Sequence, residues 1–177
     1  MIPLPVSRTI FLTGGLCLGL AATVFAQAPF QFPTANHSLY TVGDELKFLA
    51  PTAPDKPWTT GSFGCVRTDG RQMHEGLDIR CLQHDRHGEP TDPVLATADG
   101  TVVYFSTKPA LSNYGKYIVL RHFIEGIEIY SLYSHLSEIQ PGLAIGKPVK
   151  AGEVIATMGR TSNIGETITK DRAHVHF

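Results

Sequence analysis

The feature that most constrains the fold is a series of short β-branched and aromatic runs that glycine and proline interrupt. The chain has 17 Gly and 12 Pro among 177 residues, and residues of these two types break helices and mark turns. Segment 127–132 alternates apolar and polar side chains, as a half-buried strand does. No stretch has helical periodicity. The sequence therefore predicts an all-β or nearly all-β fold, an antiparallel sheet sandwich or open barrel whose groove carries the functional site.

Several segments are expected to be strands, namely 44–50, 94–96, 101–106, 114–122, 127–132 and 152–158. Asp99-Gly100 lies between two of these runs and predicts a hairpin turn. Glu125-Gly126 predicts the turn between 114–122 and 127–132. We therefore expect each of these two pairs of neighbouring runs to form an antiparallel hairpin.

The N-terminus is typical of a secretory signal peptide. A single positive charge at Arg8 precedes an apolar run over 9–25 and the small residues around Ala26 and Ala28. We expect a signal peptide over 1–26, with cleavage after Ala26 or Ala28. The run is short for a membrane span of about 20 residues, so we expect no stable membrane anchor. The protein is expected to be exported to the periplasm or the extracellular cell wall.

The remaining chain has the size of one domain. We expect a linker over 29–43 and a catalytic domain over 44–177. Lys and Arg total 15 and Asp and Glu total 16, so the charge balance indicates no nucleic-acid partner. Cys65 and Cys81 are the only two cysteines after the expected signal peptide. An even pair in an exported protein predicts a disulfide.

Two short motifs indicate a metal site. His174 and His176 are two residues apart, so on a strand both imidazoles project from one face, and Val175 and Phe177 project from the other. His74 and Asp78 are four apart in a segment that Gly76 makes a poor helix. Two imidazoles and one carboxylate hold zinc and leave a coordination position for water, as a hydrolytic site requires.

An ordered set of motifs over 61–177 resembles the catalytic domain of the lysostaphin/LytM-type zinc endopeptidases, which cut peptide cross-links in bacterial cell walls. Each motif alone is weak, whereas their common order is specific. The motifs are Ser62-Phe63-Gly64 with Arg67, His74-x-x-x-Asp78, Pro93-Val94-x-Ala96 with Asp99-Gly100, Tyr114-Gly115, Tyr133-Ser134-His135-Leu136, Gly152-x-x-Ile155, Gly159 and His174-x-His176-Phe177.

The resemblance implies a role for each site residue. His74, Asp78 and His176 would bind one Zn²⁺ per chain, and His135 and His174 would be the unligated catalytic pair. Zinc-activated water would attack the scissile carbonyl, and the two imidazoles would orient or deprotonate that water and stabilise the oxyanion. The implied partner is a peptidoglycan stem or cross-bridge peptide. We expect the protein to be a monomer.

The chain departs from the family pattern near its end. The run before the final histidines, 160–173, is longer and more charged than usual, which indicates a different substrate selection. The family strand continues beyond the position of Phe177, so we expect the domain to be truncated at its C-terminal strand. Arg67 is a candidate contact for a substrate carboxylate, but we interpret it as a solvated charge. Asn113, Tyr114 and Tyr133 are candidate cleft residues that could bind a substrate amide, although loop and packing roles explain them equally well.

Two other functions compete with the peptidase. Degenerate relatives bind the cell wall or activate another hydrolase without catalysis, but such relatives typically lack ligands, and this chain has the full set. Segment 149–156 resembles the hairpin of lipoyl- and biotin-carrier domains and of sugar phosphocarriers. A carrier would need neither the ligand set nor a signal peptide.

Overall fold

The computed structural model describes residues 30–164 and 168–177. The expected signal peptide lies outside these residues. One short α-helix, α1 (Glu45–Phe48), occurs in the described part. The strands are β1 (Val66–Arg67), β2 (Gln72–Met73), β3 (Asp78–Arg80), β4 (Pro93–Leu95), β5 (Gly100–Ser106), β6 (Tyr117–Ile124), β7 (Ile127–Tyr133), β8 (Glu138–Ile139), β9 (Pro148–Val149), β10 (Val154–Thr157) and β11 (His174–His176). No described helix has the length and apolar character that crossing a membrane requires.

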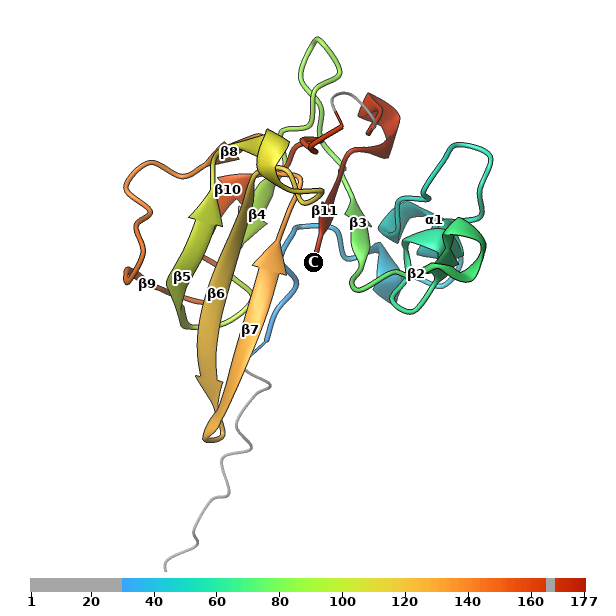
Figure 1. The fold of residues 1–177 in the computed structure, drawn as a ribbon. Helices are drawn as coiled ribbons and strands as arrows, with labels where there is room; N and C mark the ends of the chain where they lie inside the picture. The colour runs from blue at the N-terminus through green and yellow to red at the C-terminus, as the bar shows by residue number, and fades with distance from the viewer. Residues whose placement is uncertain (1–29, 165–167) are drawn as a thin grey trace, which may run out of the picture.

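The strands form antiparallel sheets, as the sequence predicts. A four-stranded sheet has the order β7-β6-β5-β9, a three-stranded sheet has the order β4-β10-β8, and β11-β3 and β1-β2 form two-stranded sheets. Figure 1 shows β11 and β3 between the larger sheets and the part of the chain that carries α1 and β2. This small central sheet therefore joins the two sides of the fold.

One apolar core lies beneath these sheets. Its largest buried side chains include Phe48, Ile79, Leu120, Tyr133 and Val175. Val175 pairs with Ile79 in the β11-β3 register, and both side chains are fully buried. Because side chains alternate across a strand, burying Val175 directs His174 and His176 to the opposite face. Core packing thus sets the orientation of the two histidines.

The described part of the expected linker packs against the domain. Gln31 N–H donates to the Thr97 carbonyl, and Leu95 N–H donates to the Pro33 carbonyl. The buried Asn36 side chain donates to the carbonyls of Lys47 and Arg80, at 2.9 and 3.1 Å. These bonds connect residues before α1 to both β3 and β4.

Two local predictions were wrong. Segment 44–50 contains α1 instead of a strand, because one helical turn buries Phe48 in the core beside Phe32. The runs on either side of Asp99-Gly100 do not pair with each other, since β4 pairs with β10 and β5 pairs with β6 and β9. The prediction of a β6-β7 hairpin is confirmed, with Glu125 and Gly126 both at positive φ.

The predicted disulfide is also wrong, because Cys65 and Cys81 are both free thiols. Cys65 lies beside β1, where its carbonyl accepts the N–H of His74 at 2.8 Å. Cys81 follows β3 at the end remote from Asp78, and its buried thiol donates to the Gln83 carbonyl at 2.9 Å. Cys65 therefore lies near the Asp78 end of β3, and Cys81 lies at the other end. Burial raises the pKa of the Cys81 thiol.

Candidate metal centre

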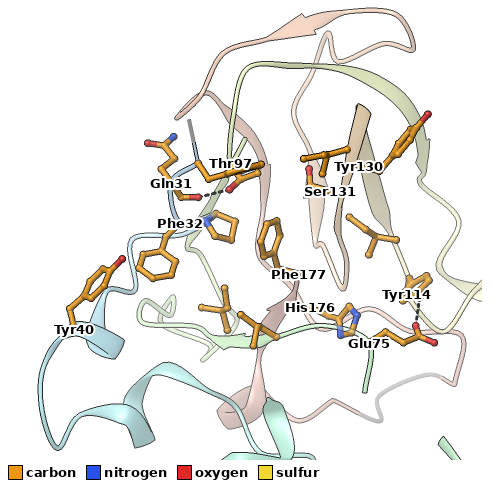
Figure 2. Close-up of a pocket in the computed structure, with 16 residues that line it drawn as sticks. Gln31, Phe32, Tyr40, Glu75, Thr97, Tyr114, Tyr130, Ser131, His176 and Phe177 are labelled. Atoms are coloured by element: carbon orange, nitrogen blue, oxygen red, sulfur yellow. Dashed lines mark hydrogen bonds between the residues drawn. The ribbon is translucent and has the colours of Figure 1, made fainter. Parts of the chain in front are cut away.

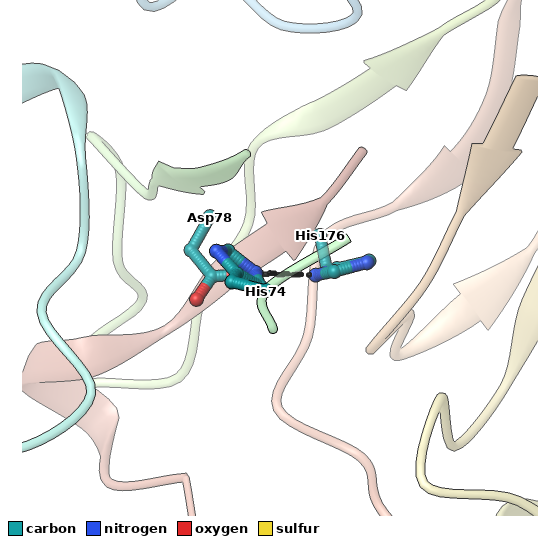
Figure 3. A group of neighbouring side chains, drawn as sticks. All are labelled: His74, Asp78 and His176. Carbon is teal, nitrogen blue, oxygen red and sulfur yellow. Dashed lines mark hydrogen bonds and ion pairs between the residues drawn. The ribbon is translucent and has the colours of Figure 1, made fainter. Parts of the chain in front are cut away.

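His74, Asp78 and His176 converge on one point (Figure 3). The His74 Nε2 and Asp78 Oδ1 atoms are 3.0 Å apart, and His176 Nδ1 is 3.0 Å from each of them. All three residues are buried, with relative exposures between 2% and 9%. Ligand atoms around a tetrahedral zinc ion at its usual bond lengths lie roughly 3.3 Å apart. The triangle has nearly this size, so these residues can hold a metal ion.

Strand pairing places the three residues. His176 lies opposite Asp78 in the β11-β3 register, and His74 directly follows β2. The end of β11 is held on both edges. Leu77 N–H donates to the Phe177 carbonyl at 2.8 Å, Phe177 N–H donates to the Leu77 carbonyl at 2.9 Å, and Ser134 N–H donates to the His176 carbonyl at 3.0 Å.

The protonation pattern of His74 indicates that a cation belongs at this point. Its Nδ1 lies 2.8 Å from the Ser62 carbonyl, and a carbonyl only accepts, so Nδ1 carries the proton. In the neutral ring Nε2 then presents a lone pair toward the Asp78 oxygen. Electron-rich atoms held 3.0 Å apart in a buried site repel one another unless a proton or a metal ion lies between them.

Two further histidines border the triangle. The His135 ring centroid lies 4.9 Å from that of His174 and 6.1 Å from that of His176. His174 Nε2 is 3.5 Å from Asp78 Oδ1. His135 Nδ1–H donates to the Thr161 carbonyl at 2.8 Å, and His174 Nδ1–H donates to the Arg172 carbonyl at 2.6 Å. Both rings therefore keep Nε2 as the nitrogen that can accept a proton.

Burial sets the charge states of this cluster. Loss of hydration, together with the nearby His174, lowers the pKa of His135 to about 3. Burial also lowers the pKa of His174. Burial opposes ionisation of Asp78, but the proximity of His174 and the contacts with His176 and His74 outweigh it and hold the pKa of Asp78 below its usual range. Near neutral pH the cluster thus contains one carboxylate and two neutral imidazoles, His135 and His174.

The cluster lines a polar cleft of about 390 Å³. Its walls include Ser162, Asn163 and Ile164 from the charged run that precedes β11. Two charged residues of that run, Arg160 and Lys170, pair instead with Glu89, at 2.8 and 3.1 Å. The loop over 83–90 therefore anchors the run that forms one wall of the cleft.

A second, mostly apolar groove of about 610 Å³ adjoins the cleft (Figure 2). The groove and the cleft share Glu75, Tyr114 and His176. Tyr114 O–H donates to the Glu75 carboxylate at 2.8 Å, and the Tyr114 ring lies 5.7 Å from that of His176. The Tyr114-Glu75 pair therefore marks the boundary between the polar cleft and the apolar groove.

All five sequence-predicted site residues lie together in the structure. Of the other candidates, Asn113 and Tyr114 line the cleft, whereas Tyr133 is buried and its hydroxyl accepts the Thr97 N–H at 2.9 Å. The interpretation of Arg67 as a solvated charge was wrong, because its guanidinium pairs with Asp78 at 2.8 Å. Glu75 was also missed. Its partner Tyr114 is distant in sequence, and no local pattern signals the contact.

We expect Gly76→Ala to weaken both folding and metal binding. A Cβ at Gly76 would lie 2.5 Å from the Phe177 carbonyl oxygen and 3.0 Å from His176 Nε2. Overpacking of this kind typically costs about 1–3 kcal/mol, and relief would require movement of the strand that carries His176. Thermal unfolding with and without zinc measures both effects.

Gly142→Ala is the matched control for Gly76→Ala. Its Cβ would meet nothing within 4 Å, although its φ of +81° makes alanine unfavourable. This variant should lose some stability and keep the full stabilisation by zinc. If zinc raised the melting temperatures of both variants equally, the contact of Gly76 with β11 would have no influence on the metal centre.

The sequence of residues 72–177 matches that of peptidase family M23. This match spans more than half of the chain and includes all five candidate site residues. The chain belongs to peptidase family M23. For an M23 chain, the His74, Asp78 and His176 group is the candidate metal centre, and the antiparallel sheets that carry it are those of the family fold.

Several known proteins are similar to this M23 chain. The murein hydrolase activator NlpD of Salmonella typhimurium is 30% identical over 137 residues, which are 76% of this chain and 32% of the relative. The lipoprotein NlpD/LppB homolog of Pseudomonas aeruginosa is 33% identical over 106 residues, 59% of this chain and 28% of the relative. The chain therefore spans about a third of the length of these relatives. A crystal structure of a zinc containing peptidase from Vibrio cholerae matches with a TM-score of 0.48 and 27% identity, over 66% of this chain and 31% of that one.

Proposed function

We propose that this chain is a zinc metallo-endopeptidase that hydrolyses peptide cross-links of bacterial peptidoglycan after export to the periplasm or cell wall. The convergence of His74, Asp78 and His176 beside two neutral histidines is the observation that carries the proposal. Membership of a peptidase family supports the reaction class, and the relatives named as murein hydrolase activators support the cell-wall location. We propose one zinc ion per monomeric chain.

The residues divide into ligands and proton carriers. His74 Nε2, Asp78 Oδ1 and His176 Nδ1 would hold the metal and leave a coordination position for water. A bound zinc ion would polarise the scissile carbonyl and acidify a water molecule. His135 and His174 have neutral rings whose Nδ1–H groups are committed to backbone carbonyls. Each can therefore accept a proton from the attacking water at Nε2 and return it to the leaving amine.

The catalytic proposal is tested on purified cell walls. Sacculi are digested with the protein, with and without a zinc chelator, and the released muropeptides are analysed by mass spectrometry. We expect cross-linked muropeptides to decrease, the chelator to stop this decrease, and added zinc to restore it. Intact cross-links in the presence of stoichiometric zinc would contradict the proposal.

The second candidate function is activation of another murein hydrolase without catalysis. The similarity to the murein hydrolase activator NlpD of Salmonella typhimurium favours it. An activator would stimulate a separate murein hydrolase equally well with and without chelator, and it would leave peptide cross-links intact by itself. A peptidase would cleave cross-links by itself, and its effect would be lost when chelator is added. Cleavage by the protein alone and the effect of chelator therefore decide between these functions.

A further inference from the structure

The two oxygens of the Asp78 carboxylate have different partners. Oδ1 faces the metal centre, 3.0 Å from His74 Nε2 and 3.0 Å from His176 Nδ1. Oδ2 faces away and accepts a hydrogen bond from Arg67 Nη2 at 2.8 Å. The Asp78 side chain is 6% exposed and that of Arg67 is 23% exposed. This largely buried ion pair therefore occupies the oxygen that does not face the other ligands.

Arg67 is itself held in place. Its Nη2 also donates to the Thr60 carbonyl at 2.6 Å. Arg67 lies on β1, opposite Gln72 of β2, and His74 follows β2. The β1-β2 hairpin therefore places His74 beside Oδ1 and Arg67 beside Oδ2 of the Asp78 carboxylate.

We infer that Arg67 is a positioning residue, which fixes Asp78 as a one-oxygen ligand and thereby tightens metal binding. The inference rests on the proposed zinc centre. A carboxylate with both oxygens free can rotate or bind a metal through either or both of them. A charge-assisted hydrogen bond to Oδ2 removes these alternatives before the metal arrives. Arg67 thus acts on the metal through Asp78.

The Arg67 guanidinium contacts both Asp78 and Thr60 through one nitrogen, Nη2. Among the described residues its Nε is buried without a hydrogen-bond partner, and a buried donor of this kind destabilises the fold. The Nε of Arg80 is in the same situation. A variant of Arg80 therefore shows how much of any effect at Arg67 comes from this common feature.

The inference predicts that zinc affinity falls when Arg67 is replaced. The affinities of wild type, Arg67→Gln and Arg67→Lys are measured by competition with a chromophoric chelator. Losing an outer hydrogen-bond partner of a metal ligand typically weakens binding about 10–100-fold, and we expect this loss in Arg67→Gln. Lysine keeps the charge without the planar fork, so Arg67→Lys should have intermediate affinity. Because the Arg67 charge alone repels a dication, unchanged or tighter binding in Arg67→Gln would overturn the inference.

Two further measurements separate positioning from general structural damage. The visible spectrum of the cobalt-substituted protein reports on the ligand arrangement, and we expect it to change in Arg67→Gln. Arg80→Gln is the control, because the Arg80 guanidinium donates to two backbone carbonyls, those of Asp171 and Leu49, and like Arg67 it has a buried Nε without a partner among the described residues. Arg80→Gln should keep the wild-type spectrum and affinity. An equal loss of affinity in both variants would assign the effect to the fold.

The failure of the inference is distinguishable from that of the proposed function. If wild-type protein bound no zinc, the proposed metal centre itself would be wrong. If wild type bound zinc and cleaved cross-links while Arg67→Gln did the same with equal affinity, only the positioning role would be wrong.

Discussion

Replacing His74 with alanine is expected to abolish zinc binding and cross-link cleavage together. The side chain is 2% exposed and supplies one corner of the ligand triangle. Asp78 and His176 alone leave two protein ligands where a catalytic zinc site has three. Loss of an outer partner already weakens metal binding about 10–100-fold, so loss of a ligand should exceed the upper end of that range. Metal content of the purified variant and muropeptide analysis measure the two effects.

The matched control for this experiment is His87→Ala. His87 is exposed, and its Nε2 accepts a hydrogen bond from the exposed Arg86 at 3.0 Å. This variant should keep one zinc per chain and full cleavage. Zinc retained at wild-type affinity in His74→Ala would remove His74 from the ligand set and would contradict the arrangement in Figure 3.

Replacing His135 is expected to stop catalysis while zinc remains bound. His135 borders the ligand triangle without belonging to it, and its neutral ring can accept a proton only at Nε2. General acid-base groups typically contribute about 10²–10⁴-fold to the rate, so we expect kcat to fall by that order with little change in zinc content. His174→Ala, measured in parallel, shows how the two histidines share the proton transfers.

The backbone of His135 requires a second variant. Its φ is +61°, in the left-handed region that alanine adopts unfavourably and asparagine tolerates. His135→Asn should therefore lose kcat as strongly as His135→Ala but unfold closer to the wild-type temperature. An active His135→Asn protein with bound zinc would exclude proton transfer by this residue. Loss of zinc from both variants would instead indicate a ligand role.

The five candidate site residues lie together in the structure, and local spacing accounts for four of them, whereas His135 was included only because of the family resemblance. The alternation of a strand places His174 and His176 on one face, and the register of β11 with β3 brings His176 opposite Asp78 as this pattern requires. The antiparallel class also followed, because short runs between glycine and proline turns leave few alternatives. These inferences depend on local geometry, which one sequence contains.

The errors have a common physical origin in long-range packing. The residues of segment 44–50 predicted a strand, but burial of Phe48 against Phe32 favours a helical turn. Asp99-Gly100 has the composition of a hairpin turn, yet β4 pairs with β10, and β5 pairs with β6 and β9. The roles of Arg67 and Glu75 were missed for the same reason. Their partners, Asp78 and Tyr114, become neighbours only after the sheets assemble.

The proton positions of three histidines depend on backbone carbonyls, those of Ser62, Thr161 and Arg172. A carbonyl acceptor is present whatever amino acid occupies the position. Substitutions of the Arg172 side chain, which lines the cleft, can therefore reshape the cleft without changing which imidazole nitrogen carries its hydrogen. The backbone therefore fixes which nitrogen of each imidazole carries the hydrogen, and side-chain substitutions in the cleft can change its shape and charge while these proton positions are kept.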